Sequence, residues 1–218
     1  MTKLIWDSVG ERFFETGVDQ GVLYVTTTVA YDTAIPWNGL TSVTESPSGA
    51  EATPLYADNR KYLNLVSAEM FGATIEAFSY PEEFGLCDGT ASPKTGVTVG
   101  QQARAQFGLS YRTKLGNDVD GDDHGYKIHV VYGCLAKPTE KGYATVNDSP
   151  EAAAFSWELS TTPVAVTDLR PTSLLVFDST KLAPADLLAI EDALYGDATT
   201  GTGSLPLPDA LLALIAGA

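Results

Sequence analysis

The chain has 218 residues, of which 44% are hydrophobic and 19% charged, a balance typical of globular proteins that argues against overall disorder. Its 28 acidic and 13 basic residues give a formal net charge of −15, which excludes the basic surface with which nucleic-acid-binding proteins neutralise phosphates. The same charge is compatible with a surface that lets DNA pass without holding it.

The sequence shows neither a clear targeting signal nor a cysteine motif of a metal or redox site. Asp7 interrupts the apolar run of residues 4–6 too early for a secretory signal, and no apolar run reaches the length of a membrane-spanning helix. Cys87 and Cys134 lack the CxxC spacing of metal or redox sites, so two buried free thiols are expected, with a disulfide as the alternative. We therefore expect a soluble protein made in a reducing cytoplasm.

The chain begins with a segment that shows no clean period. Residues 1–20 mix charges with Trp6, Phe13 and Phe14, which predicts an extended arm that docks on another surface. Residues 21–31 are dense in Val, Thr and Tyr and predict the first strand. Asn38-Gly39 is a strong signal for a two-residue hairpin turn, followed by a return strand over residues 41–45.

The stretch from Tyr56 to Asp88 contains two runs rich in aromatic, aliphatic and β-branched residues. These runs, Arg60–Val66 and Met70–Tyr80, are separated by residues 67–69, which is the length of a hairpin loop. Pro81 cannot donate to a ladder and should end the second strand. The pattern predicts a long hairpin that pairs beyond its own subunit.

Three later runs alternate strictly between apolar and polar positions. Their apolar members predict one buried face each, with a polar face opposite, as in antiparallel sheets; they are Phe107, Leu109 and Tyr111, then Tyr126, Ile128, Val130 and Tyr132, then Phe155, Trp157 and Leu159. Residues 115–125 between the first two predict a solvated acidic loop. Residues 164–166 and 174–177 predict two further short strands.

One helix is predicted, over residues 184–195. Pro184 suits the first helical position, Leu187, Ile190 and Leu194 share a face, and Gly196 is placed to end the helix. Residues 197–218 predict a linker and an apolar tail that is either a docking segment or a small edge element. The expected fold is therefore one mainly β domain over residues 21–196, an antiparallel sandwich or barrel with a flanking helix and two arm-like termini.

No constellation of residues predicts catalysis, a metal site or a cofactor. Asp118, Asp120 and Asp122 resemble the start of a calcium loop, but the sixth position is Asp123 instead of Gly and the twelfth is His129 instead of Glu. His124 and His129 form no standard ligand motif, and the sequence contains no nucleophile elbow, HExxH or P-loop.

Four segments resemble, in the same order, the major tail protein of long, non-contractile-tailed bacteriophages. They are PWNGLTSVTESPSGAEATPLYADNRKYLNL, FGATIEAFSYPEEFGLCDG, FGLSYRTKLGNDVDGDDHGYKIHVVYG and SPEAAAFSWELSTTPV, and the resemblance extends over about residues 8–196. It implies a tail-tube fold whose subunits form stacked hexameric rings, with a long hairpin from each subunit joining a β-barrel that lines the lumen. The implied partners are further copies of the chain, a tape-measure protein, and tail terminator and distal tail proteins, while DNA passes through the lumen without specific binding.

The resemblance also implies a location in the virion, as part of a tail assembled in the host cytoplasm. We expect the barrel hairpin to use Arg60, Tyr62, Asn64, Val66, Phe71, Thr74, Glu76 and Phe78, and a ring-stacking loop to use Asn117, Asp118, Asp120, Asp122 and Asp123. Two alternatives remain: a single-ring tail component, such as a distal tail or terminator protein, and a receptor- or glycan-binding β-sandwich.

Overall fold

The computed structural model describes residues 3–26, 31, 33–143, 145, 152–197 and 201–215. The elements in chain order are β1 (Phe14–Val25), β2 (Ala34–Trp37), β3 (Leu40–Glu45), β4 (Ser48–Gly49), β5 (Ala52–Ala57), β6 (Arg60–Val66), β7 (Glu69–Met70), β8 (Gly72–Ala77), the 3-10 helix η1 (Glu82–Leu86), β9 (Ala91–Lys94), β10 (Val97–Val99), β11 (Phe107–Asn117), β12 (Gly121–Ala136), β13 (Phe155–Thr161), β14 (Leu174–Asp178), α1 (Pro184–Tyr195) and α2 (Pro208–Leu212). The protein is mainly β, as predicted, and none of the helices described is long and apolar enough to cross a membrane.

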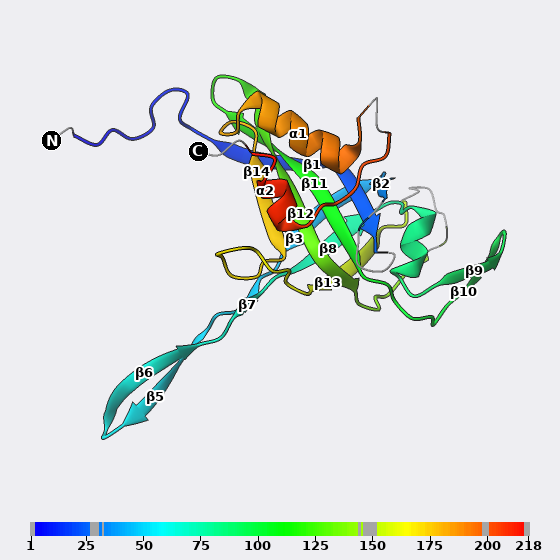
Figure 1. The fold of residues 1–218 in the computed structure, drawn as a ribbon, viewed down its shortest axis with the longest axis horizontal. Coiled ribbons are helices and arrows are strands. Elements are labelled where there is room, and N and C mark those ends of the chain that lie inside the picture. The colour runs from blue at the N-terminus through cyan, green and yellow to red at the C-terminus, as the bar shows by residue number, and fades with distance from the viewer. Residues whose placement is uncertain are drawn as a thin grey trace.

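The body is one eight-stranded antiparallel sheet that curls on itself (Figure 1). Its strands follow the order β2-β1-β11-β12-β13-β8-β3, and β14 pairs with β12 beside this path. β2 and β3 lie at opposite ends of the path, yet only Asn38 and Gly39 separate them in the chain. The two ends of the sheet are therefore held close together, as in a barrel that is not fully closed.

The predicted Asn38-Gly39 turn is confirmed, but the hairpin pairing expected around it is wrong. β2 pairs with β1 and β3 pairs with β8, so the turn carries the chain from one end of the sheet to the other. Gly39 has φ +80, and a Cβ there would lie 2.6 Å from Oγ of Ser79. That hydroxyl donates to the Asn38 carbonyl at 2.7 Å, so the turn packs against the end of β8 too closely for a side chain.

Two apolar clusters occupy the two faces of the curled sheet. The inner core includes Leu23, Trp37, Ile75, Phe84, Phe107, Leu109, Tyr111, Val131 and Trp157. The outer core includes Val22, Tyr24, Ile128, Val130, Tyr132 and Phe177 of the sheet, together with Ile190, Leu194, Leu205 and Leu211. The helices α1 and α2 thus cover the outer face of β1, β12 and β14.

The alternation of the predicted strands is confirmed, but the expectation of one polar face is wrong for β11 and β12. Ser110 is fully buried and His129 is 8% exposed, although both lie opposite the apolar positions. The reason is that both faces of these central strands are covered: the outer face by helices, and the inner face by other strands of the curled sheet. Residues 164–166, predicted to be a strand, form only one isolated bridge, between Val164 and Thr172.

The predicted helix is confirmed in its bounds and in its buried face. Ile190 and Leu194 are fully buried and Leu187 packs beside them, while Gly196 caps the helix with φ +85. The C-terminal tail docks on the body through Leu205 and Leu211. Part of the predicted linker, residues 198–200, lies outside the described residues. Cys87 and Cys134 are both buried and free.

Candidate assembly surface

A long two-stranded projection leaves the body between β3 and β8 (Figure 1). Its outer part is the β5–β6 ladder and its base is the short β4–β7 pair. The projection is built differently from the predicted hairpin, in which Arg60–Val66 paired with Met70–Tyr80. That pairing is wrong, because β6 pairs with β5, while β8 is a body strand between β3 and β13.

The turn that makes this hairpin is Asp58-Asn59. Both residues have positive φ, at 50° and 59°, as the two-residue hairpin turn that matches strand twist requires. Asp and Asn tolerate this conformation better than most side chains, because their short polar groups bond locally to the backbone. Residues 67–69 were predicted to be the hairpin loop, but residues 67–68 join β6 to β7 and Glu69 begins β7.

The projection exposes large apolar side chains that no described part of the chain covers. These are Leu55, Tyr56, Tyr62, Leu63, Leu65, Val66 and Met70, with exposed fractions between 38% and 71%. A two-stranded hairpin with this much apolar surface is marginally stable alone in water. An uncovered apolar strand pair of this kind is typical of a surface that pairs with another chain.

The register of β5 and β6 separates two faces of the projection. Directly paired residues share a face, so Leu55, Leu63, Leu65 and Thr53 lie on one side. Asn64 pairs with Pro54, and Val66 with Ala52, on the other side. One face is therefore a row of leucines, which we call the leucine face, and the opposite face is mixed.

The eight residues predicted for the barrel hairpin fall into two groups. Arg60, Tyr62, Asn64 and Val66 lie on β6 within the projection, whereas Thr74 and Glu76 lie on β8 in the body, with Phe71 and Phe78 flanking that strand. Glu76 accepts a hydrogen bond from Ser42 of β3 at 2.9 Å. The structure therefore does not bring the eight together on one hairpin.

The acidic segment predicted to be a mobile ring-stacking loop is mostly strand. β11 runs to Asn117 and β12 starts at Gly121, so the loop over residues 115–125 shrinks to a turn of three residues. Asn117 is buried, and its Oδ1 accepts hydrogen bonds from the backbone N–H groups of Val119 and Asp120. Asp122 and Asp123 are exposed at the start of β12.

Asp118 holds the N-terminal segment against the body. Its Oδ1 accepts hydrogen bonds from the backbone N–H groups of Gly10 at 3.0 Å and Arg12 at 3.4 Å, and Oδ2 lies 3.8 Å from the Arg12 guanidinium. Residues 3–7 extend beyond this anchor and away from the body (Figure 1), with Leu4, Ile5 and Trp6 72–77% exposed. The predicted arm is thus shorter than residues 1–20, because β1 already begins at Phe14.

A polar cluster that the sequence did not reveal surrounds His129 of β12. Its ring stacks on Tyr111 with centroids 4.7 Å apart; Nε2 is 3.0 Å from Oγ1 of Thr113, and Nδ1 is 3.2 Å from Oε1 of Glu45 but not in hydrogen-bond geometry. The Tyr111 hydroxyl donates to the same Glu45 oxygen at 2.6 Å. His129 is therefore buried, although the alternation of its strand predicted a polar face at this position.

The carboxylates of Glu15 and Glu45 reach this histidine from β1 and β3. Glu15 also lies 2.6 Å from Lys127, and Thr113 donates to it at 2.5 Å. Desolvation lowers the pKa of His129, and the nearby carboxylates offset that effect only in part. Although burial opposes the change, hydrogen bonds from Lys127 and Thr113 lower the pKa of Glu15.

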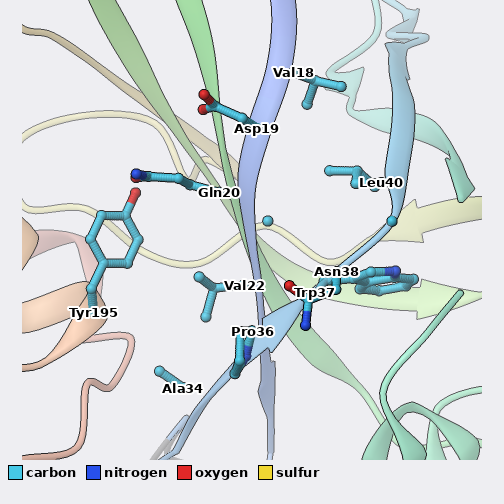
Figure 2. A pocket seen from close by; sticks show the side chains of 12 residues that line it. Val18, Asp19, Gln20, Val22, Ala34, Pro36, Trp37, Asn38, Leu40 and Tyr195 are labelled. Carbon is cyan, nitrogen blue, oxygen red and sulfur yellow. The ribbon is translucent and has the colours of Figure 1, made fainter.

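A depression of about 680 Å³ lies where the sheet fails to close (Figure 2). It is lined by residues of β1, β2, β3 and α1 and of the turn between β2 and β3. These residues are Val18, Asp19, Gln20, Gly21, Val22, Ala34, Pro36, Trp37, Asn38, Gly39, Leu40 and Tyr195. We call this depression the seam pocket. Within the described part of the chain, no group of three or more His, Cys, Asp or Glu side chains is placed to hold a metal ion.

No family model matches the chain, and no curated protein matches its sequence. Among solved structures, a chain of the anti-feeding prophage baseplate, 6-fold symmetrised, is 10% identical with a TM-score of 0.37, covering 82% of this chain and 100% of that one. The sheath–tube complex of the PVC extracellular contractile injection system, in the extended state, is 14% identical with a TM-score of 0.33, covering 79% and 93%. The sheath/tube terminator of the PVC system is 11% identical with a TM-score of 0.30, covering 80% and 99%.

Proposed function

We propose that this chain is a structural, non-enzymatic subunit of a phage tail tube, of the long non-contractile type, and that it polymerises with copies of itself as stacked hexameric rings. The observation that carries the proposal is the projection over residues 48–70, whose leucine face is left exposed by the described part of its own chain. The sequence resemblance over about residues 8–196 supports it. The tube resides in the virion and conducts DNA into the host.

The two faces of the projection have different roles in this proposal. When hairpins from neighbouring subunits pair edge to edge, their unpaired backbone groups are satisfied and the apolar face is removed from water. The leucine face then packs outward against the surrounding subunit bodies, and the face that carries Asn64 and Tyr62 is directed to the lumen. Arg60, Tyr62, Asn64 and Val66 belong to the barrel wall, with Thr74 and Glu76 at its base.

The charge of the chain agrees with a lumen that conducts DNA. With 28 acidic and 13 basic residues, the chain offers few cations to phosphates, and each Lys or Arg contact would slow a translocating polyanion. The remaining partners in this proposal are a tape-measure protein within the tube and terminator and distal tail proteins at its ends.

A pair of substitutions on opposite faces of β6 tests the proposal. Leu63→Asp places a charge on the leucine face and should abolish assembly, because an unpaired carboxylate would be buried at the interface. Asn64→Asp, one residue away on the other face, should leave assembly intact. Sedimentation velocity over a range of concentrations measures both. Large particles from Leu63→Asp, or a native chain that stays monomeric throughout, would contradict the proposal.

A further inference from the structure

The seam pocket lies beside two strand edges that have no partner. β2 pairs with β1 only from Gly21 to Tyr24, so the same side of β1 from Phe14 to Gln20 is unpaired among the described residues. Within the same part of the chain, β3 pairs with β8 alone, which leaves its other edge open. β1 and β3 approach within 8 Å between Cα atoms, and the pocket opens beside this approach.

The lining of the pocket suits an apolar segment of extended chain. Val18 and Leu40 stand on one side of β1, and Gln20 and Tyr195 stand on the other (Figure 2). The Tyr195 hydroxyl is buried and has no hydrogen-bond partner among the residues that the structure describes. β1 is irregular here, with register shifts between Thr16 and Asp19 and between Asp19 and Val22. An irregular open edge beside an apolar pocket is the arrangement that accepts an added strand, with backbone bonds for affinity and the pocket for side chains.

The chain carries a segment with matching properties. Residues 3–6 form no helix or strand and extend away from the body (Figure 1), and Leu4, Ile5 and Trp6 are 72–77% exposed. Three adjacent large apolar side chains in water are unfavourable unless another surface covers them, since each contributes about 1.5–3 kcal/mol when fully buried.

A subunit's own arm lies apart from its own seam pocket and extends away from the body (Figure 1). Asp118 fixes Gly10 beyond the start of β1, and Trp6 is four residues further out, which is about 13 Å of extended chain. The strand from Phe14 to Val18, where the lining of the pocket begins, covers about 13 Å in the opposite direction. Residues 3–7 therefore lie beyond the N-terminal end of β1, whereas the pocket lies beside the middle of that strand. A second copy can supply an arm to the pocket while each Asp118 anchor stays intact.

We infer that residues 3–7 of one copy add to the open edge of β1 in a second copy, with the apolar side chains of the arm in the seam pocket. The contact is heterologous, because different surfaces of the two copies meet, and such a contact builds rings or filaments. This inference rests on the proposed self-assembly and gives the arm and the pocket as the residues that join successive copies.

Cross-linking between two variants tests the contact. Full-length Ile5→Cys and full-length Asn38→Cys are mixed and treated with a short bismaleimide near neutral pH, so a covalent heterodimer requires the arm of one chain at the pocket of the other. The native thiols do not compete, because Cys87 and Cys134 are buried and burial raises the pKa of Cys87 to about 12. The matched control replaces Asn38→Cys by Val97→Cys, on the exposed β10 away from the pocket.

The expected result is a heterodimer with Asn38→Cys and none above background with Val97→Cys. Adding Leu4→Ser and Trp6→Ser to the Ile5→Cys chain should lower the yield about tenfold or more, because two apolar anchors are lost. Assembly of the native chain is measured in parallel. Particles without the heterodimer overturn this inference and leave the proposed function standing. If neither the heterodimer nor particles form, this inference and the proposed function are both overturned. A heterodimer without particles supports the arm contact and contradicts the proposed tube.

Discussion

At the scale of single residues, His129 makes stability depend on pH. Its folded-state pKa lies below the ordinary value of 6.5, because burial disfavours the imidazolium more than Glu45 and Glu15 favour it. The unfolded chain therefore binds a proton on this residue that the folded chain does not bind. This part of the stability is fully present above about pH 7 and is lost as the pH falls below 6.5.

We predict that the free energy of unfolding falls between pH 7.5 and pH 5.5, and that His129→Gln makes this fall shallower. Urea unfolding at several pH values in this window measures the change. The window lies above the ordinary value of 4.5 for Glu15, so loss of stability through that carboxylate is confined to lower pH. His124→Gln is the matched control, and an unchanged slope in His129→Gln would contradict the assignment.

Tyr24 links β1 to the end of α1. Its buried hydroxyl donates to the carbonyl of Leu194 at 2.9 Å and lies 3.1 Å from Oγ of Ser110. Tyr24→Phe should lower the free energy of unfolding by about 1–3 kcal/mol, because these buried polar groups lose their partner. Tyr56→Phe, on the exposed projection, should change it by less than about 0.5 kcal/mol. Equal effects in urea unfolding would show that the Tyr24 hydroxyl contributes nothing.

Residue types alone could not reveal the environment of His129. Alternation along residues 126–132 correctly placed this histidine opposite Ile128 and Val130, but it did not show that this face is also enclosed. The cluster around His129 is formed by Glu15 of β1, Glu45 of β3, and Tyr111 and Thr113 of β11, three strands that are far apart in the chain. Only the pairing of β1 and β12 with β11 brings most of these residues together.

At the scale of elements, Asp118 fixes the arm to the β11–β12 turn. Asp118→Ala removes the acceptor of two backbone N–H groups and the partner of the Arg12 side chain. We expect trypsin cleavage after Arg12 to become about tenfold faster, because hydrogen bonds to a charged group contribute about 1.5–3 kcal/mol. Asp122→Ala, in the same acidic segment but exposed, is the control. Equal cleavage rates in the two variants would show that Asp118 does not hold the arm.

Helices and strands with strong local sequence signals were predicted well, but the pairing of the strands with one another was not. Residues 184–195 carry a proline start, an apolar face and a glycine stop, and α1 has these bounds. The alternating runs became β11, β12 and β13. The predicted pairing of the hairpin was wrong because an apolar run indicates a strand without indicating its partner. Asp58-Asn59 is also a weaker turn signal than Asn-Gly or Asp-Gly. β5, whose Pro54 weakens the local strand pattern, was therefore missed.

At the scale of the whole molecule, the fold separates a body with its own apolar cores from surfaces that need a partner. The inner and outer cores enclose the largest side chains of the body, whereas the projection and the arm expose Leu63, Leu65, Ile5 and Trp6. Burial of these exposed side chains by other copies would account for both features. Fold class could be predicted from the strand pattern, but the position of the projection required the register.

The most direct measurement is negative-stain electron microscopy of the native protein beside a variant that lacks the projection. In this variant residues 50–68 are replaced by Asn-Gly, which keeps β4, β7 and the body strand β8. The native protein should form hollow tubes or stacked rings, and the variant should remain a folded monomer by circular dichroism and sedimentation. Identical tubes from the variant, or native single rings that never stack, would contradict the tail-tube proposal.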